Sequence, residues 1–170
     1  MLVTLELPIK LLNKLKDLSE SRGAPLEEVI LEAVYGYLEL SDPDVKTELD
    51  LKLCERYLRD ADNLLTGGDY VQAGGKFWGA AAQMVKAVAA KKGATLDTHI
   101  KLWDFIAELR VKLEDPEIGR LWASANSLHK NFYEAQVSPE LVKDYAQDVK
   151  RLIKKLKKLT EAEGSHGESS

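Results

Sequence analysis

Residues 68–93 read GDYVQAGGKFWGAAAQMVKAVAAKKG, and this stretch decides the fold. Its apolar side chains recur at spacings of three and four residues, which predicts a helix with one buried face. Asp69 is a good N-cap for that helix. Gly74, Gly75 and Gly79 each cost a helix about 0.5–1 kcal/mol relative to alanine. We therefore expect these glycines to allow close packing against a neighbouring helix.

The chain around this stretch has the composition of a soluble globular protein. It has 170 residues, of which 45% are hydrophobic and 31% are charged. No apolar run approaches the roughly 18 residues that span a bilayer, and no N-terminal signal is recognisable. Cys54 is the single cysteine, so one chain has neither a disulfide nor a cage of thiolates around a metal. We expect a cytoplasmic protein with no membrane contact, no bound metal and no cofactor.

Further amphipathic segments accompany the central helix. Apolar residues at helical spacing predict helices over residues 45–65, from about residue 99, from Asp115, and from Ser138 onward. Asp115 and Ser138 each precede a proline and a glutamate, the pattern of a capped first turn. Residues 44–160 are thus predicted to form an all-α, up-and-down helical bundle. The polar residues 161–170 are predicted to be a disordered tail.

Residues 1–43 follow a different pattern. Residues 2–7, LVTLEL, alternate in polarity, which predicts a short half-buried strand. Two helices are predicted after it, one starting at Pro8 and one at Pro25. This strand-helix-helix order resembles the ribbon-helix-helix unit. Because a lone strand cannot satisfy its own backbone hydrogen bonds, we expect this unit to pair with a second copy, giving a homodimer.

DNA binding by this N-terminal unit is disfavoured by its charge. In DNA-binding members of the ribbon-helix-helix family, alternate strand residues enter the major groove, where Arg, Lys, Asn or Gln read bases. The corresponding residues here are Thr4 and Glu6. Residues 1–44 contain four Lys/Arg and nine Asp/Glu, a net charge of −5 that opposes attraction to phosphates. A DNA-binding regulator is therefore the least favoured of the functions considered.

A second resemblance covers roughly residues 46–158. Residues 68–93, followed by LDTHIKLWDFI at 96–106 and ANSLHKNFYE at 125–134, resemble the archaeal paREP family, a branch of the HEPN superfamily. The resemblance implies a HEPN-like bundle of four or five helices that is usually dimeric. Its relatives are either metal-independent ribonucleases or nonhydrolytic modules that bind substrate beside a nucleotidyltransferase.

The catalytic motif of that superfamily is incomplete here. Catalytic members carry an arginine, four to six intervening residues, and then a histidine. Counting back from His129, the arginine positions hold Trp122, Ala123 and Ser124. The nearest upstream arginine, Arg120, lies about 13 Å away along an unbroken helix and faces its opposite side. The resemblance therefore favours a noncatalytic module over a nuclease.

His129 has two interpretations. On the helical stripe of residues 118–132 it is a candidate core or interface histidine. Alternatively, an imidazole that titrates near neutral pH is a credible general base for an RNA 2′-hydroxyl. Asn126 and Tyr133 share its edge of the helix and are candidate ligand-binding residues. Arg120 and Lys130 are the candidate cations for a phosphate in that case.

The C-terminal segment is the candidate nucleic-acid-binding surface. Residues 150–158, KRLIKKLKK, hold six basic residues and no acid. Such a patch can hold RNA phosphates, but cations at a helix C-terminus also complement the helix dipole and keep the helix soluble. The basic side chains assigned to phosphate binding are Lys150, Arg151, Lys154, Lys155 and Lys158.

The remaining aromatic residues give weaker signals. Trp78, Trp103 and Trp122 all lie on apolar stripes, so they are predicted to be core residues rather than platforms for stacked bases. His99 stands alone near the start of its helix. Glycine-rich phosphate loops, paired zinc-ligand histidines and serine elbows do not occur in the sequence.

Two classes of function lead. The first is a noncatalytic dimeric HEPN-like module that binds a nucleotide, RNA or a partner protein such as a nucleotidyltransferase. The second is a metal-independent, toxin-like endoribonuclease that uses His129.

Overall fold

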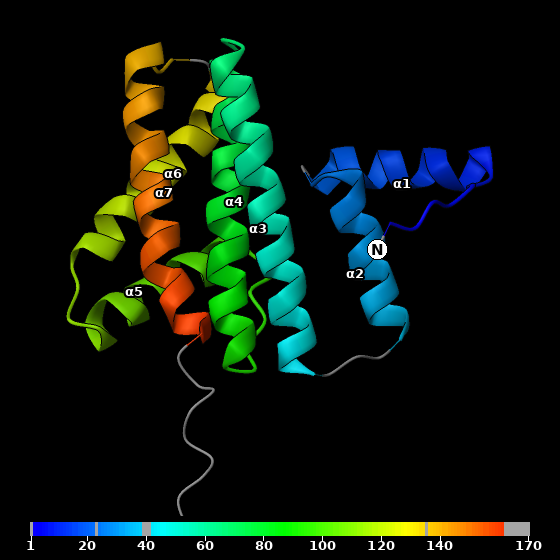
Figure 1. The fold of residues 1–170 in the computed structure, drawn as a ribbon, viewed down its shortest axis with the longest axis horizontal. Coiled ribbons are helices and arrows are strands. Elements are labelled where there is room, and N and C mark those ends of the chain that lie inside the picture. Colours follow the sequence, from blue (N-terminus) through cyan, green and yellow to red (C-terminus); the bar gives the residue numbers. More distant parts are fainter. Residues whose placement is uncertain (1, 23, 39–41, 135, 162–170) are drawn as a thin grey trace, which may run out of the picture. The chain divides into compact units, whose positions relative to one another are not determined.

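The computed structural model describes residues 2–22, 24–38, 42–134 and 136–161, and within these residues the chain is helical, with seven α-helices (Figure 1). Contacts divide it into two compact units, Met1–Ser41 and Asp42–Ser170. The sequence placed the boundary after residue 43. The predicted disordered tail lies outside the described residues, except for Glu161, which ends the last helix.

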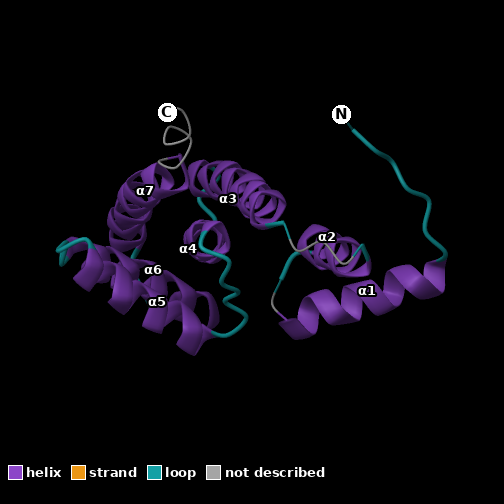
Figure 2. Cartoon of the chain, turned by 90° about the horizontal axis from the view of Figure 1, so that it is seen from below, coloured by secondary structure: helices purple, strands orange, loops and turns teal. Residues whose placement is uncertain are grey.

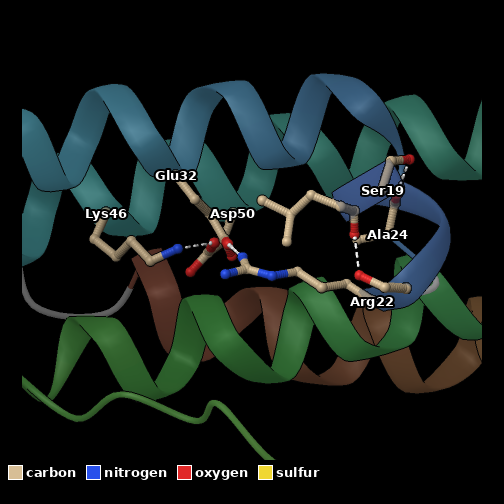
Figure 3. A network of polar contacts seen from close by, with 8 residues as sticks. Ser19, Arg22, Ala24, Glu32, Lys46 and Asp50 are labelled. Carbon is tan, nitrogen blue, oxygen red and sulfur yellow. Dashed lines mark hydrogen bonds and ion pairs between the residues drawn. The ribbon is translucent and has the colours of Figure 1, made fainter. Parts of the chain in front are cut away.

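The first unit is a helical pair, α1 (Ile9–Arg22) and α2 (Leu26–Tyr37). The Arg22 guanidinium lies 3.2 Å from the Glu32 carboxylate and links the two helices. At the turn between them, the Ser19 hydroxyl donates a hydrogen bond to the Ala24 carbonyl (Figure 3). The short loop and these two contacts fix α1 against α2.

The strand predicted at residues 2–7 is wrong, because none of the described residues forms a strand. The alternation of polar and apolar side chains is present, but a strand also needs a second strand to satisfy its backbone groups. No other described segment forms a strand that could pair with it. Residues 2–8 are instead irregular and lead into α1.

The second unit is a bundle of five helices built around α4 (Tyr70–Lys91), which packs against each of the other four. Figure 2 shows α4 end-on, with the remaining helices arranged around it. Those helices are α3 (Pro43–Thr66), α5 (His99–Lys112), α6 (Glu117–Glu134) and α7 (Pro139–Glu161). The predicted helical bundle is confirmed.

Side-chain caps set the starts of these helices. Asp69 accepts a hydrogen bond from the Gln72 backbone N–H at 3.1 Å, which confirms it as the N-cap of α4. Thr98 caps α5 in the same way, and Asp115 accepts from the backbone N–H of Glu117 at the start of α6. These caps satisfy backbone donors that a helix start leaves without partners.

The α3 helix carries ion pairs between residues one turn apart. Lys46 Nζ lies 2.7 Å from Asp50 Oδ1, and the Asp50 side chain is 1% exposed (Figure 3). A buried carboxylate needs such a partner, because an unpaired charge away from water is costly. This end of α3 is thus held by charge as well as by apolar packing.

The core of the bundle is mainly apolar and fills the space between all five helices. The largest fully buried side chains of the core are Phe77, Met84, Val85, Val88, Ile106, Leu109, Ile118, Trp122, Leu128, Val142, Leu152 and Leu156.

No helix in the described part of the chain is long and apolar enough to cross a membrane.

Glycines allow the closest helix contacts, as the sequence predicted. A Cβ atom on Gly79 would lie 2.9 Å from Cδ2 of the buried Tyr57 ring of α3. A Cβ on Gly74 would lie 3.4 Å from the Leu128 side chain of α6. Gly79 therefore sets how near α3 approaches α4, whereas a Cβ at Gly74 would make an ordinary van der Waals contact with α6.

We predict that Gly79→Ala lowers the free energy of unfolding by about 1–2 kcal/mol. Overpacking of a core costs about 1–3 kcal/mol, and alanine returns only about 0.5–1 kcal/mol of helix propensity. Gly119→Ala in α6 is the control, because its nearest neighbour is the flexible Arg110 side chain at 3.3 Å. Urea denaturation measures both variants. Equal stability of Gly79→Ala and the wild type would contradict this account of the α3–α4 contact.

Candidate functional site

Three helices bring one tryptophan and two histidines into ring contact. The His99 imidazole, from the first turn of α5, stacks on the Trp78 indole of α4 with ring centroids 5.4 Å apart and an angle of 1° between planes. His129 of α6 lies 4.7 Å from Trp78 and 4.8 Å from His99, centroid to centroid. His99 is exposed and His129 is half-buried, so this group of rings opens to solvent.

Two further indoles extend the group into the core. Trp122 of α6 lies 4.9 Å from Trp78, and Trp103 of α5 meets Trp122 edge-on with centroids 6.0 Å apart. Trp122 is fully buried and Trp78 is 9% exposed, whereas Trp103 is 40% exposed. We call these five residues, Trp78, His99, Trp103, Trp122 and His129, the aromatic cluster.

The cluster corrects one expectation and reveals one residue that was missed. The core prediction is confirmed for Trp78 and Trp122 but is wrong for Trp103, because α5 lies at the edge of the bundle and that indole reaches solvent. His99 was treated as an isolated residue, yet it contacts His129 from thirty positions away in sequence. Periodicity within one helix cannot report that contact. The only local hint is that His99 stands one turn before Trp103.

The electrostatics of His129 follow from its place in the cluster. Burial, and then the nearby His99 imidazole, hold the pKa of His129 below its ordinary value of 6.5. A neutral imidazole is therefore the dominant form of His129 at neutral pH. In that form it is one donor and one acceptor and carries no charge.

The other residues assigned to this site from sequence are spread along α6. Asn126 is half-buried, and Lys130 is exposed beside His129. Arg120 is exposed in the first turns of the helix, where its charge helps to lower the pKa of Asp115. The Tyr133 side chain lies outside what the structure describes. The structure thus brings His129 together with aromatic rings, while Arg120 remains near the opposite end of α6.

Asn131, which is buried on α6, was not among the candidate residues predicted from the sequence. Its side-chain oxygen accepts a hydrogen bond from the Val137 backbone N–H at 2.7 Å. That bond holds the segment between α6 and α7 and is structural.

The basic residues of α7 form ion pairs with acids of the bundle. Lys150 lies 2.7 Å from Asp62 of α3, and Arg151 lies 2.7 Å from Glu117 of α6. Lys155 lies 2.7 Å from both Asp115 and Glu117. These pairs connect α7 to its neighbours.

The same ion pairs shift the titration of their members. Hydrogen bonds from Lys155 hold the pKa values of Asp115 and Glu117 below their ordinary ranges. The two carboxylates in turn raise the pKa of Lys155. Of the candidate phosphate-binding cations, Lys154 and Lys158 are exposed and form no ion pair with the described residues. Phosphate binding by α7 stays a prediction that rests mainly on these two.

Candidate metal ligands are not grouped together in the described part of the chain. No group of three or more His, Cys, Asp or Glu side chains is placed there to hold a metal ion. Cys54 is buried, and burial raises the pKa of its thiol to about 12, so the thiol stays protonated and unreactive. The aromatic cluster, which brings rings from three helices together and opens to solvent, is the candidate functional site.

We predict that the aromatic cluster makes stability pH-dependent below neutrality. Because the pKa of folded His129 is lower than its unfolded value, the unfolded state binds more protons there. The free energy of unfolding should therefore be fully retained above about pH 6.5 and should fall as the pH drops through the folded pKa. In the variant His99→Gln, NMR titration should show the His129 pKa rising toward 6.5. An unchanged His129 pKa in that variant would contradict the assigned contact.

Comparisons with known proteins place the bundle in a family. The model of the archaeal PaREP1/PaREP8 family matches residues 49–153. The crystal structure of a protein from Sulfolobus solfataricus is similar at 26% identity and a TM-score of 0.57, over 63% of this chain and 95% of that one. No curated protein matches the chain. Since the family model covers more than half of the sequence, the chain belongs to the archaeal PaREP1/PaREP8 family.

Proposed function

We propose that the chain is a noncatalytic module whose aromatic cluster binds a base of a nucleotide or of single-stranded RNA. One observation carries the proposal: the exposed His99 ring lies parallel to Trp78 and is backed by His129. A planar ring fixed from behind and open to solvent in front is the arrangement on which bases stack. Such stacking contributes about 1–3 kcal/mol per base in proteins that bind single-stranded nucleic acids.

The same geometry supports binding rather than cleavage. Cleavage of RNA without a metal needs a cation beside the phosphate in the transition state. The arginine positions of the HEPN motif hold Trp122, Ala123 and Ser124, and Trp122 is buried in the cluster. Arg120 lies about 13 Å from His129 along α6. The five-helix bundle suits a HEPN-like module, in which His129 is retained but the arginine of the catalytic motif is missing.

The proposal includes a homodimer formed through the first unit. No residue of α1 is fully buried, and a unit of about forty residues seldom has enough core to be stable alone. A second copy would cover this apolar surface, so sedimentation of the full chain should give the mass of two chains. The exposed apolar residues of the unit are Leu2, Val3, Leu5, Ile9, Leu11, Leu18, Val34, Tyr37 and Leu38.

A second candidate function is favoured by the histidine pair. His99 and His129 lie 4.8 Å apart, centroid to centroid, so one could act as base toward an RNA 2′-hydroxyl and the other as acid toward the leaving oxygen. Their stacked arrangement places ring faces, rather than ring nitrogens, toward each other. That orientation suits a platform for a stacked base better than an acid and a base that act from opposite sides of a phosphate. A partner protein such as a nucleotidyltransferase remains the other class of ligand for the module.

We predict that His99→Ala weakens binding of a fluorescein-labelled eight-nucleotide RNA of mixed sequence by about 5- to 100-fold, the loss of one stacked base. Fluorescence anisotropy at fixed salt measures the dissociation constant. Val111→Ala is the matched control, since Val111 is an exposed apolar residue on the same helix, about two turns beyond Trp103. Equal affinities of the wild type and His99→Ala for the RNA would show that the aromatic cluster is not the binding site.

We predict that the same RNA stays intact with the wild-type protein in EDTA. The cation that the cleavage transition state requires is missing from the motif, so the cluster should bind without cutting. The check is gel analysis beside His129→Ala, shown by circular dichroism to be folded. Cleavage by the wild type that disappears in His129→Ala would overturn the noncatalytic assignment in favour of the endoribonuclease.

A further inference from the structure

The aromatic cluster contains a buried hydrogen-bond donor without an acceptor. Trp122 is fully buried, and its Nε1–H has no hydrogen-bond partner among the described residues. An indole nitrogen can only donate, and buried indole N–H groups usually have a partner. Leaving a buried donor unsatisfied costs stability, so an acceptor on a ligand that reaches this N–H would recover that cost.

The rings around Trp122 differ in how easily a ligand can replace them. Trp78 covers one part of the indole and is itself 9% exposed, within the packed centre of the bundle. Trp103 meets Trp122 edge-on and is 40% exposed. Trp103 also belongs to α5, which packs against α4 and α6 at the edge of the bundle. Of the two indoles in contact with Trp122, Trp103 is therefore the one that a flat ligand can displace into solvent.

We propose that the Trp122 Nε1–H is the specificity-determining donor of the site, and that it binds a ring carbonyl of a nucleobase which takes the place of the Trp103 indole. The inference rests on the proposed base-binding function and names the class of base. The displaced indole and the incoming base are both flat aromatic rings of similar thickness. The base thus keeps an aromatic contact with Trp122 and supplies the acceptor that the Trp122 Nε1–H lacks.

The donor chemistry selects among bases. Uracil and guanine carry carbonyl oxygens on the ring, whereas adenine has none. A protein site that donates a hydrogen bond to a ligand group rejects analogues lacking that group, because its buried donor is then left without a partner. Trp122 should therefore favour uracil and guanine over adenine. His99 stacks on any base and gives no such preference.

The test compares uridine and adenosine monophosphates by isothermal titration calorimetry with the full-length protein. Trp122→Phe keeps an aromatic ring but removes the N–H, so uridine monophosphate should bind about tenfold more weakly and adenosine monophosphate within about twofold of wild type. Trp78→Phe is the matched control and should change both affinities by a similar factor. Trp103→Ala removes the ring that must move, so uridine monophosphate should bind severalfold more tightly.

Each outcome bears on the inference. A selective loss of affinity for uridine monophosphate in Trp122→Phe supports the inference. Tighter binding of uridine monophosphate by Trp103→Ala also supports it, and this variant serves as the test if Trp122→Phe does not fold. Equal losses for both nucleotides in Trp122→Phe, or weaker binding by Trp103→Ala, would overturn it while leaving the base-binding function intact. Failure of the wild type to bind either mononucleotide or RNA would overturn both.

Discussion

The bundle depends on the close approach of its neighbours to α4. Gly79 leaves room for the Tyr57 ring of α3, so α3 approaches the α4 backbone more closely than a larger residue would allow. At Gly74, an added Cβ would make an ordinary van der Waals contact with Leu128 of α6. Because α4 packs against the four other helices of the bundle, its position determines where their inward-facing side chains meet. The alanines of α4 continue this small-residue surface and are almost all fully buried. Alanine is a strong helix former, so the loss of helix propensity in α4 comes mainly from the glycines.

The aromatic cluster is a consequence of that packing. Trp78 stands next to Gly79, on the side of α4 that faces α5 and α6, and its indole contacts rings from both of those helices. The rings of His99 and His129 can reach it only because α5 begins, and α6 runs, close to α4. Burial and the proximity of the His99 imidazole keep the His129 pKa low, so His129 is mainly neutral at neutral pH. A partly open set of rings is suited to stacking, and phosphate charge would have to be met by lysines outside it.

The sequence predicted the structure well where the pattern of spacing and capping lies within a single helix. The α4 stripe, its Asp69 cap and the role of its glycines could be predicted because spacing and capping are local. The strand at residues 2–7 was wrong because alternation does not report whether a pairing strand exists. The contact between His99 and His129 could not be predicted, since it depends on how two helices meet. The exposure of Trp103 was missed for a related reason: an apolar stripe predicts a buried face, but α5 has bundle neighbours on only part of its surface.

The most direct measurement of the central claim is an NMR titration of the protein, labelled in its histidine rings, with a short single-stranded RNA. A base stacked on the cluster should shift the ring signals of His99 and His129 together, through its ring current, and the midpoints of both shifts should agree. His166, which lies outside the described residues, is the third histidine and serves as the internal reference. RNA that binds with no change at His99 and His129 would contradict the assignment of the aromatic cluster as the binding site.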